Sequence, residues 1–300
     1  MGLYLTSNVA AMNAYQNLSV TQNQLQVSIQ QLSSGYRINS AANDPSGLAI
    51  SQGLQAQIGG LTQAVQNAQN GISVAQTAEG ALNETQAILQ RMNTLAVESA
   101  NGGSMSTQAQ QAAQTEFSQL QTQLNQIASS TNFNGQSLLN GSYSGVFQIG
   151  ATAATFNQST VDMSASGIGT MMTAAGISSV TGLDASGLGV GTSVALTASG
   201  NSAASNAALA ASAISAITNA INAVSTVRAN LGAYQNAFQH TINNLNTAVT
   251  NLTASNAAIQ DTNFASTMAT FTQQQILQQA GVSVLAQANQ LPSSVLKLLG

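Results

Sequence analysis

Apolar residues recur at alternating steps of four and three along both ends of this chain, and this pattern limits its fold more than any other feature. Such steps place apolar side chains on one narrow stripe of an α-helix. The stripe is shielded from water only when the helix packs against another helix. The first stripe ends at Gly35, because glycine readily adopts the left-handed backbone of a helix C-cap. Its members include Leu18, Leu25, Ile29 and Leu32.

A second stripe predicts an unusually long helix over residues 48–98. Asp44 and Pro45 precede it, as an N-cap followed by a first-turn proline. One helix of this length would span roughly 75 Å, which is more than a compact domain of this size needs. A glycine-rich break at residues 101–103 separates it from a third predicted helix. The first apolar positions of the long helix are Leu54, Ile58, Leu61 and Val65.

The same spacing returns in the C-terminal third of the chain. One stripe contains Phe238, Ile242, Leu245, Val249 and Leu252, and a last helical stretch carries Val284, Leu291 and Val295. Pro292 predicts a kink or a break near the end of that stretch. Arg228 also falls on a stripe, where a charge is costly unless it is paired. We expect it to meet Asp44 or a glutamate of the long helix, in a structural or register role.

The middle of the chain has a different texture. Asn-Gly turns at residues 134–135 and 140–141 precede short strand-like runs at residues 146–149 and 154–156, which predict a small β-hairpin region. Residues 164–201 are rich in Gly, Ser, Ala and Thr with weak periodicity. We expect this segment to be variable, surface-exposed and too short for more than a small loop or vestigial domain.

These elements predict a mainly α fold, with long antiparallel helical rods, terminal coiled-coil helices and the β-hairpin region in the middle. We expect three parts. Residues 1–44 and 256–300 form an inner terminal coiled-coil domain, and residues 45–163 and 202–255 form a helical rod domain with the hairpin. Residues 164–201 form the exposed segment.

Composition excludes several classes of function. Only 4% of residues are charged and the net charge is -4, so little repulsion keeps like copies apart. The basic residues Arg37, Arg91, Arg228 and Lys297 are scattered, which argues against a nucleic-acid partner. No apolar run reaches the roughly 18 residues of a membrane span, and no N-terminal Sec-type signal peptide is visible.

Catalytic and metal-binding patterns are also missing from the sequence. The chain has no cysteine, and His240 is its single histidine, which makes a poor metal site. Glu79 and Glu84 lie five apart on one predicted helix and Glu98 is remote, so no glycosidase-type carboxylate pair is indicated. Without a nucleophile and base or a phosphate loop, we predict no enzyme activity and no cofactor.

Two terminal helices that pack as an antiparallel pair bury little of their apolar stripes. The remaining apolar surface must find other copies of the protein. We therefore predict a helical polymer. The alternative is an extended secreted adhesin or a junction protein of related build, and a junction protein would close into a ring of fixed copy number.

Long motifs at both ends resemble bacterial flagellins, over residues 1 to about 160 and 203–300. Residues 32–51 (LSSGYRINSAANDPSGLAIS) resemble the N-terminal flagellin signature. Residues 230–236, 240–245, 275–281 and 284–290 (NLGAYQN, HTINNL, QILQQAG and VLAQANQ) look like the C-terminal motifs. Motifs of this length in the expected order are far more specific than a short pattern.

The resemblance implies an extracellular structural subunit of the flagellar filament used for swimming. It further implies export of the unfolded chain by the flagellar type III route and folding beneath a cap protein. Hook-junction proteins and an export chaperone are the other implied partners. Without large outer domains, we expect a thin and smooth filament.

The resemblance also marks a candidate segment for an animal innate immune receptor. Residues 89–97 are similar to the flagellin segment that such a receptor senses, with Gln90, Arg91 and Leu95 as the candidate residues. Thr94 stands where recognised flagellins usually carry an acidic residue, so this sequence departs from the pattern at that position.

The low charge carries a separate hypothesis. Stability changes with pH only through groups whose pKa differs between states, so a filament held by neutral contacts should tolerate acid. An organism living at low pH would explain the composition, and compositional drift is the alternative.

Overall fold

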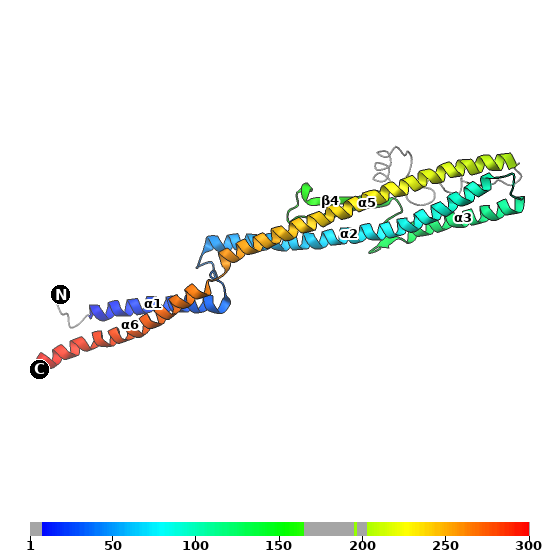
Figure 1. Cartoon of the computed structure of the whole chain (residues 1–300). Helices are drawn as coiled ribbons and strands as arrows, with labels where there is room; N and C mark the ends of the chain where they lie inside the picture. The colour runs from blue at the N-terminus through cyan, green and yellow to red at the C-terminus, as the bar shows by residue number, and fades with distance from the viewer. Residues whose placement is uncertain (1–7, 165–194, 197–202, 300) are drawn as a thin grey trace. The chain divides into compact units, whose positions relative to one another are not determined.

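The computed structural model describes residues 8–164, 195–196 and 203–299, without the side chains of residues 203–205 and 291–299. The predicted mainly α fold is confirmed (Figure 1). The helices are α1 (Val9–Ser34), α2 (Pro45–Ala100), α3 (Thr107–Ser130), α5 (Ala203–Gln260) and α6 (Phe264–Leu299), with a 3-10 helix η1 (Thr155–Asn157). The strands are β1 (Asn132–Phe133), β2 (Gln136–Ser137), β3 (Ser142–Gln148) and β4 (Gln158–Ser164).

Packing divides the chain into two compact units, which we describe separately. The terminal unit comprises Met1–Ile58 and Thr250–Gly300, and the central unit comprises Gly59–Val249. Both ends of the chain therefore contribute to the terminal unit.

In the terminal unit, α1 and α6 lie side by side and run antiparallel (Figure 1). α1 ends as predicted at Gly35, whose φ is 77° and whose N–H donates to the carbonyl of Gln31 at 3.0 Å. The backbone just after α1 then pairs with the backbone just before α6. Thr262 donates its N–H to the carbonyl of Gly35 at 2.9 Å. This hydrogen bond connects the end of α1 to the start of α6.

The start of α2 also follows the prediction. Asp44 accepts a hydrogen bond from the backbone N–H of Gly47 at 2.8 Å, and Pro45 is the first helical residue. Ser51, one turn further on, donates its hydroxyl to Asn256 of α5 at 2.7 Å. These contacts fix the first turns of α2 against the end of α5 within the terminal unit.

In the central unit, α2, α3 and α5 run side by side around one apolar core (Figure 1). Aromatic and aliphatic side chains fill that core, and the large ones include Leu82, Leu89, Met92, Phe117, Leu124, Leu138, Leu139, Met163 and Phe238. The ring of Phe238 lies so close to Gly71 that a Cβ on that glycine would come within 2.8 Å of it. Phe147 of β3 packs edge to face against the same ring, with its ring centroid 5.6 Å from that of Phe238.

α5 includes a stretch, Asn206–Gln260, that is long and apolar enough to cross a membrane by length and composition. Its buried residues Ile217, Val224 and Phe238 belong to the core of the central unit. A buried core helix passes the same test, so this stretch gives no specific evidence for a membrane span.

The hairpin region contains two antiparallel pairs, β1 with β2 and β3 with β4. Asn134 and Gly135 form the first turn with φ angles of 50° and 79°, as an Asn-Gly hairpin requires. The prediction of a strand at residues 154–156 was wrong, because Thr155–Asn157 form η1 and β4 starts at Gln158. Asn157 bonds through its side chain to the hydroxyl of Thr152 at 2.6 Å, and such local bonds compete with a strand ladder.

Two further expectations differ from the structure. α6 does not break at Pro292 but continues to Leu299. Most of the predicted exposed segment, residues 164–201, lies outside the described residues, but Leu196 is fully buried and donates its backbone N–H to Gln114 at 2.7 Å. At this one point the segment contributes to the core rather than to the surface.

Candidate assembly surface

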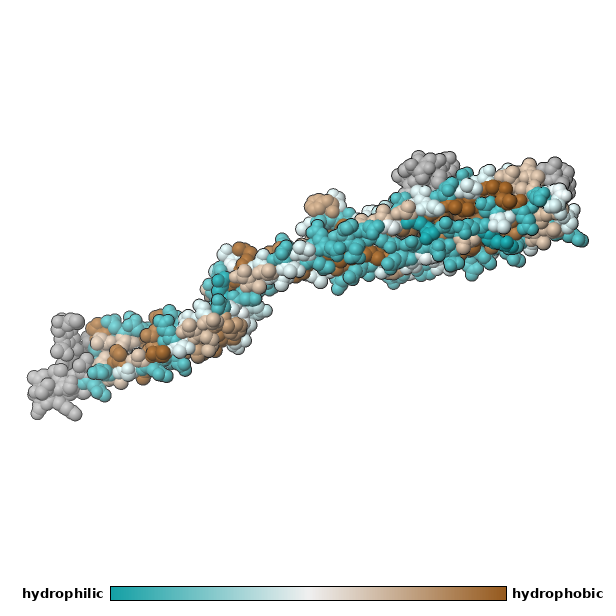
Figure 2. Space-filling view, in the orientation of Figure 1, coloured by the Kyte–Doolittle hydropathy of each residue, from teal (hydrophilic) through white to brown (hydrophobic). Residues whose placement is uncertain are grey.

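Large apolar side chains lie exposed along both helices of the terminal unit. A two-helix pair can cover only one side of each helix, so the rest of each helix faces solvent. Figure 2 shows apolar surface alternating with hydrophilic surface on this pair. The exposed residues are Val9, Met12, Tyr15, Val20, Val27 and Ile29 on α1, and Phe264, Met268, Ile276, Leu277, Val282 and Val284 on α6. We call this set the terminal apolar face.

Two grooves lie between the paired helices. One groove of about 390 Å³ is lined by Ala10 of α1 and by Ser283, Val284, Gln287 and Ala288 of α6. The other, of about 230 Å³, passes Leu18 and Gly281, where a Cβ on the glycine would lie 3.3 Å from the leucine side chain. Side chains of another helix can insert into these grooves when it packs on the terminal apolar face.

A buried polar pair sits inside the α1–α6 contact. Ser28 donates its hydroxyl to the side-chain oxygen of Gln274 at 2.8 Å, and both residues are buried. A hydrogen bond at one position of an apolar seam favours a single register, because sliding either helix would leave both groups unpaired. The terminal pair thus has a defined alignment even though it buries little apolar area.

The predicted seam residues whose side chains the structure describes fall into three groups. Phe238, Ile242 and Leu245 are buried within the chain, and Ile29 and Val284 are exposed. Leu18, Leu25, Leu32, Leu54, Ile58, Leu61, Val65, Val249 and Leu252 are half-buried. Leu291 and Val295 lie on α6, outside the side chains that the structure describes. The buried group already has partners within its own chain and offers nothing to a second copy.

Sequence reasoning missed most of the terminal apolar face. The search for one stripe per helix found the exposed Ile29 and Val284, whereas Met12, Val20 and Ile276 lie off those stripes. The signal was present, because a helix with apolar residues around much of its circumference is one that is buried on several sides. Counting apolar residues outside the seam would have identified these positions.

Arg228 has the partner that its place on a seam predicts. Its guanidinium lies 3.9 Å from the carboxylate of Glu79 on α2 and donates to the side-chain oxygen of Gln86. Gln235 donates to the same glutamate at 2.8 Å. Glu79, rather than Asp44, is therefore the acid of this pair. The four side chains form a polar layer between α2 and α5 and contain no catalytic arrangement.

The candidate receptor segment is only partly accessible. Gln90 and Arg91 are exposed, but Leu95 is buried in the core of the central unit. Arg91 forms a bidentate ion pair with Glu116 of α3, with Nε to Oε1 at 2.7 Å and the second contact at 3.0 Å. The hydrogen bond and charge of Arg91 lower the pKa of Glu116, and Glu116 raises the pKa of Arg91.

Among the described residues, no group of three or more His, Asp or Glu side chains is placed to hold a metal ion. His240 is exposed on α5, and Glu84 and Glu98 are exposed on α2. The geometry instead defines a structural subunit. The helices from the two ends of its chain pack against each other and leave the terminal apolar face uncovered.

Comparison with known proteins identifies the subunit. Residues 5–144 match the bacterial flagellin N-terminal helical region, and residues 214–299 match the bacterial flagellin C-terminal helical region. A flagellin of Bacillus subtilis is 41% identical over 98% of this chain and 99% of its own length. A flagellin of Halalkalibacterium halodurans is 42% identical over 99% of this chain and 100% of its own length. The chain belongs to the bacterial flagellin family.

A solved structure supports the fold. A putative flagellar hook-associated protein from Vibrio parahaemolyticus is similar over 73% of this chain and all of its own, with a TM-score of 0.57 at 14% identity. At that identity the likeness concerns the fold alone. The family membership makes this chain a structural subunit of the flagellar filament and not an enzyme.

Proposed function

We propose that the terminal apolar face is the surface through which copies of this flagellin assemble. The observation that carries this proposal is the exposure of twelve large apolar side chains on a two-helix pair. Large apolar side chains exposed in this number along one helix pair mark a protein contact. Leu291 and Val295 extend the same proposal to the end of α6.

The proposal gives each part of the chain a separate role. Residues 1–44 and 256–300 form the inner coiled-coil layer of the filament, and residues 45–163 and 202–255 form the surrounding helical layer. The short segment at residues 164–201 leaves the outer surface thin and smooth. Support comes from the burial pattern, since the largest fully buried side chains of the chain pack in a core within the central unit.

Export, location and partners follow from the family. Flagellin relatives form an extracellular filament, and we propose the same location for this chain, reached through the flagellar type III route as an unfolded chain. A cap protein, hook-junction proteins and an export chaperone are its proposed partners besides further copies. Gln90 and Arg91 remain the accessible part of the proposed receptor segment.

A truncation experiment tests the assembly role of the terminal helices. The full chain and a chain lacking residues 1–40 and 260–300 are purified, induced to assemble and examined by electron microscopy. We expect long uniform filaments from the full chain alone. Closed rings of fixed copy number from the full chain would instead support a junction protein, and filaments from the truncated chain would overturn the role of the terminal helices.

A further inference from the structure

Two methionines lie on the terminal apolar face, and both are open to solvent. Met12 of α1 is 60% exposed and Met268 of α6 is 49% exposed. The thioether of an accessible methionine is oxidised to a sulfoxide, which is polar where the thioether was apolar. The terminal apolar face therefore carries two groups whose polarity a chemical reaction can change.

Both methionines have large apolar neighbours on their own helices. Residues three or four apart share one face of a helix, so Met12 lies between Val9 and Tyr15, which are also exposed. Met268 follows Phe264 by four residues on α6, and that phenylalanine is exposed as well. The side chains of Val9 and Phe264 have no hydrogen-bond donor that could satisfy a new oxygen on the neighbouring sulfur.

The other methionines whose side chains the structure describes are more protected. Met92 of α2 and Met163 of β4 belong to the core of the central unit and are 0% and 1% exposed. Met105 is half-buried against the same core. Since oxidation of a thioether requires access of the oxidant, the free subunit should react first at Met12 and Met268.

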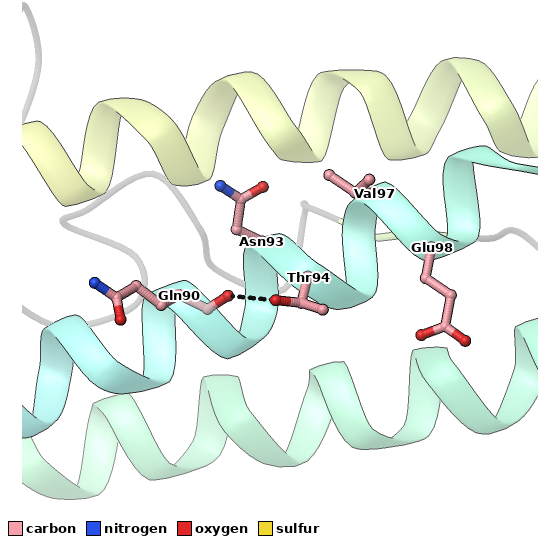
Figure 3. A pocket seen from close by; sticks show the side chains of 5 residues that line it. All are labelled: Gln90, Asn93, Thr94, Val97 and Glu98. Atoms are coloured by element: carbon pink, nitrogen blue, oxygen red, sulfur yellow. Dashed lines mark hydrogen bonds between the residues drawn. The ribbon is translucent and has the colours of Figure 1, made fainter.

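A groove on α2 lies close to Met92 in sequence but is not lined by it. Its volume of about 570 Å³ is ample for hydrogen peroxide, because a water molecule needs only about 10–15 Å³. None of the described residues that line the groove carries sulfur (Figure 3). They are Gln90, Asn93, Thr94, Val97 and Glu98. Met92 is therefore a stringent internal control, since an oxidant that fills the groove beside it meets no thioether there.

We infer that Met12 and Met268 are oxidation sites that control assembly. Hydrogen peroxide converts both to sulfoxides in the free subunit, and the oxidised subunit joins filaments poorly. The inference rests on the assembly role proposed above for the terminal apolar face. It adds a reversible modification of that face, because methionine sulfoxide reductases restore the thioether.

The reaction needs only the peroxide as a partner. The thioether sulfur attacks one peroxide oxygen, so that an S–O bond forms as the O–O bond breaks. The second oxygen leaves as water with both peroxide hydrogens. Sulfur is oxidised by two electrons and the peroxide is reduced by two. The new oxygen is a hydrogen-bond acceptor, and its burial against apolar side chains of another copy without a donor is unfavourable.

Assembly should in turn protect these two methionines. A neighbouring copy that covers the terminal apolar face also covers Met12 and Met268, so an oxidant reaches them less easily in a filament than in a free subunit. The modification therefore acts before a subunit joins, and subunits already in a filament are largely spared.

Peroxide treatment of the full chain tests the sites. Free subunits and filaments are exposed to hydrogen peroxide, catalase removes the excess, and mass spectrometry of peptides gives the sulfoxide fraction at each methionine. In free subunits Met12 and Met268 should oxidise at least about tenfold faster than Met92 and Met163, because access governs the reaction. In filaments the same two methionines should react more slowly than in free subunits.

The lowest protein concentration that supports filament growth tests the effect on assembly. Oxidation should raise this threshold of the natural chain by roughly tenfold, as expected when polar groups enter an apolar contact. Treatment of the oxidised subunit with methionine sulfoxide reductases of both epimer specificities should return the threshold to its starting value.

Matched variants assign the effect to the two sites. In a chain with both Met12→Leu and Met268→Leu, peroxide has no thioether to oxidise at either position. Each chain is compared with itself before and after peroxide, so the starting threshold of a variant does not enter. The threshold should be unchanged by peroxide in the double variant. In the control chain with Met105→Leu it should still rise by roughly tenfold.

The outcomes separate this inference from the assembly proposal. An unchanged threshold after full oxidation of Met12 and Met268, or a rise that persists in the double variant, would overturn the inference. Slower oxidation of the two methionines in filaments would in that case still support the terminal apolar face as the assembly surface. Equal oxidation in filaments and free subunits would show that the face stays uncovered and would overturn both.

Discussion

The side-chain amide of Asn8 donates a hydrogen bond to the carbonyl of Ala288 at 2.8 Å. Ala288 lies four residues before Pro292, and in a continuous helix its carbonyl would accept from the N–H that proline lacks. Asn8 thus satisfies the acceptor that Pro292 leaves unpaired, while its side-chain oxygen caps α1 by accepting from the N–H of Ala11 at 3.1 Å. This explains how α6 continues through a proline.

The relationship predicts coupling between positions 8 and 292. Asn8→Ala should destabilise the terminal pair by about 1–2 kcal/mol through the lost cap and hydrogen bond. In a chain that also carries Pro292→Ala, the new N–H bonds Ala288, so the cost of Asn8→Ala should fall by about 1 kcal/mol. Circular dichroism, recorded while filaments are heated, gives the melting temperature of the natural chain, the two single variants and the double variant. Equal costs in both backgrounds would contradict the coupling.

Gly71 and Gly80 of α2 should respond in opposite directions to alanine. A Cβ at position 71 would press on the ring of Phe238, whereas position 80 has open space around it. We expect Gly71→Ala to destabilise the central unit by about 1–3 kcal/mol through overpacking. Gly80→Ala should stabilise it by about 0.5–1 kcal/mol, because alanine favours a helix interior. Urea unfolding of the monomer decides this, and equal shifts would refute the packing argument.

The Arg91–Glu116 pair should stabilise the central unit only above acidic pH. Arg91 lowers the pKa of folded Glu116, so the unfolded chain, with a carboxyl pKa of about 4.3, binds the proton more readily. The contribution is fully present above that value and is lost as the pH falls through the lower pKa of the folded state. Because both groups are exposed, solvent screening keeps it small.

Glu116→Gln tests this pH dependence. The urea midpoint of the variant should lie below that of the natural chain at neutral pH, and the two should converge at about pH 2. Arg91→Gln should reproduce the loss at neutral pH. A difference that persisted unchanged at about pH 2 would show that the substitution acts through packing rather than through charge.

The helices and their ends could largely be predicted from the sequence, because the information is local. Gly35 and Asp44 mark helix ends through the conformation of their own backbone and side chain. The apolar spacing likewise predicts the length of α2. The position of Arg228 on an apolar seam predicts that it pairs with an acidic side chain. Each of these inferences uses residues within a few helical turns of one another, or the rule that a charge on an apolar seam is costly unless it is paired.

Contacts between distant residues could not be predicted in the same way. Phe147 and Phe238 are far apart in sequence, and only the fold brings their rings to 5.6 Å at an interplanar angle of 78°. The continuation of α6 through Pro292 depends on Asn8 at the other end of the chain. Residues 154–156 have strand-like composition, but side-chain bonds from Asn157 made the helical turn more favourable.

The scarcity of ionisable groups predicts an acid-tolerant filament. The chain has eight Asp and Glu residues in 300, so few carboxylates can change their protonation on assembly. Filaments should keep their length between neutral pH and about pH 3, measured by light scattering and electron microscopy. A charge-rich flagellin treated alongside provides the comparison, and equally rapid disassembly of both would refute the hypothesis.

The central claim, that the terminal apolar face drives assembly, is tested most directly by polar substitution in the full-length chain. Met12→Gln, Ile276→Gln and Val284→Gln together remove exposed apolar side chains without opening a cavity in the chain. The control chain carries Gln273→Ser and Gln279→Ser at exposed polar positions of α6. Electron microscopy after induced assembly should show filaments from the control and none from the triple variant, while both monomers melt alike. Normal filaments from the triple variant would contradict the claim.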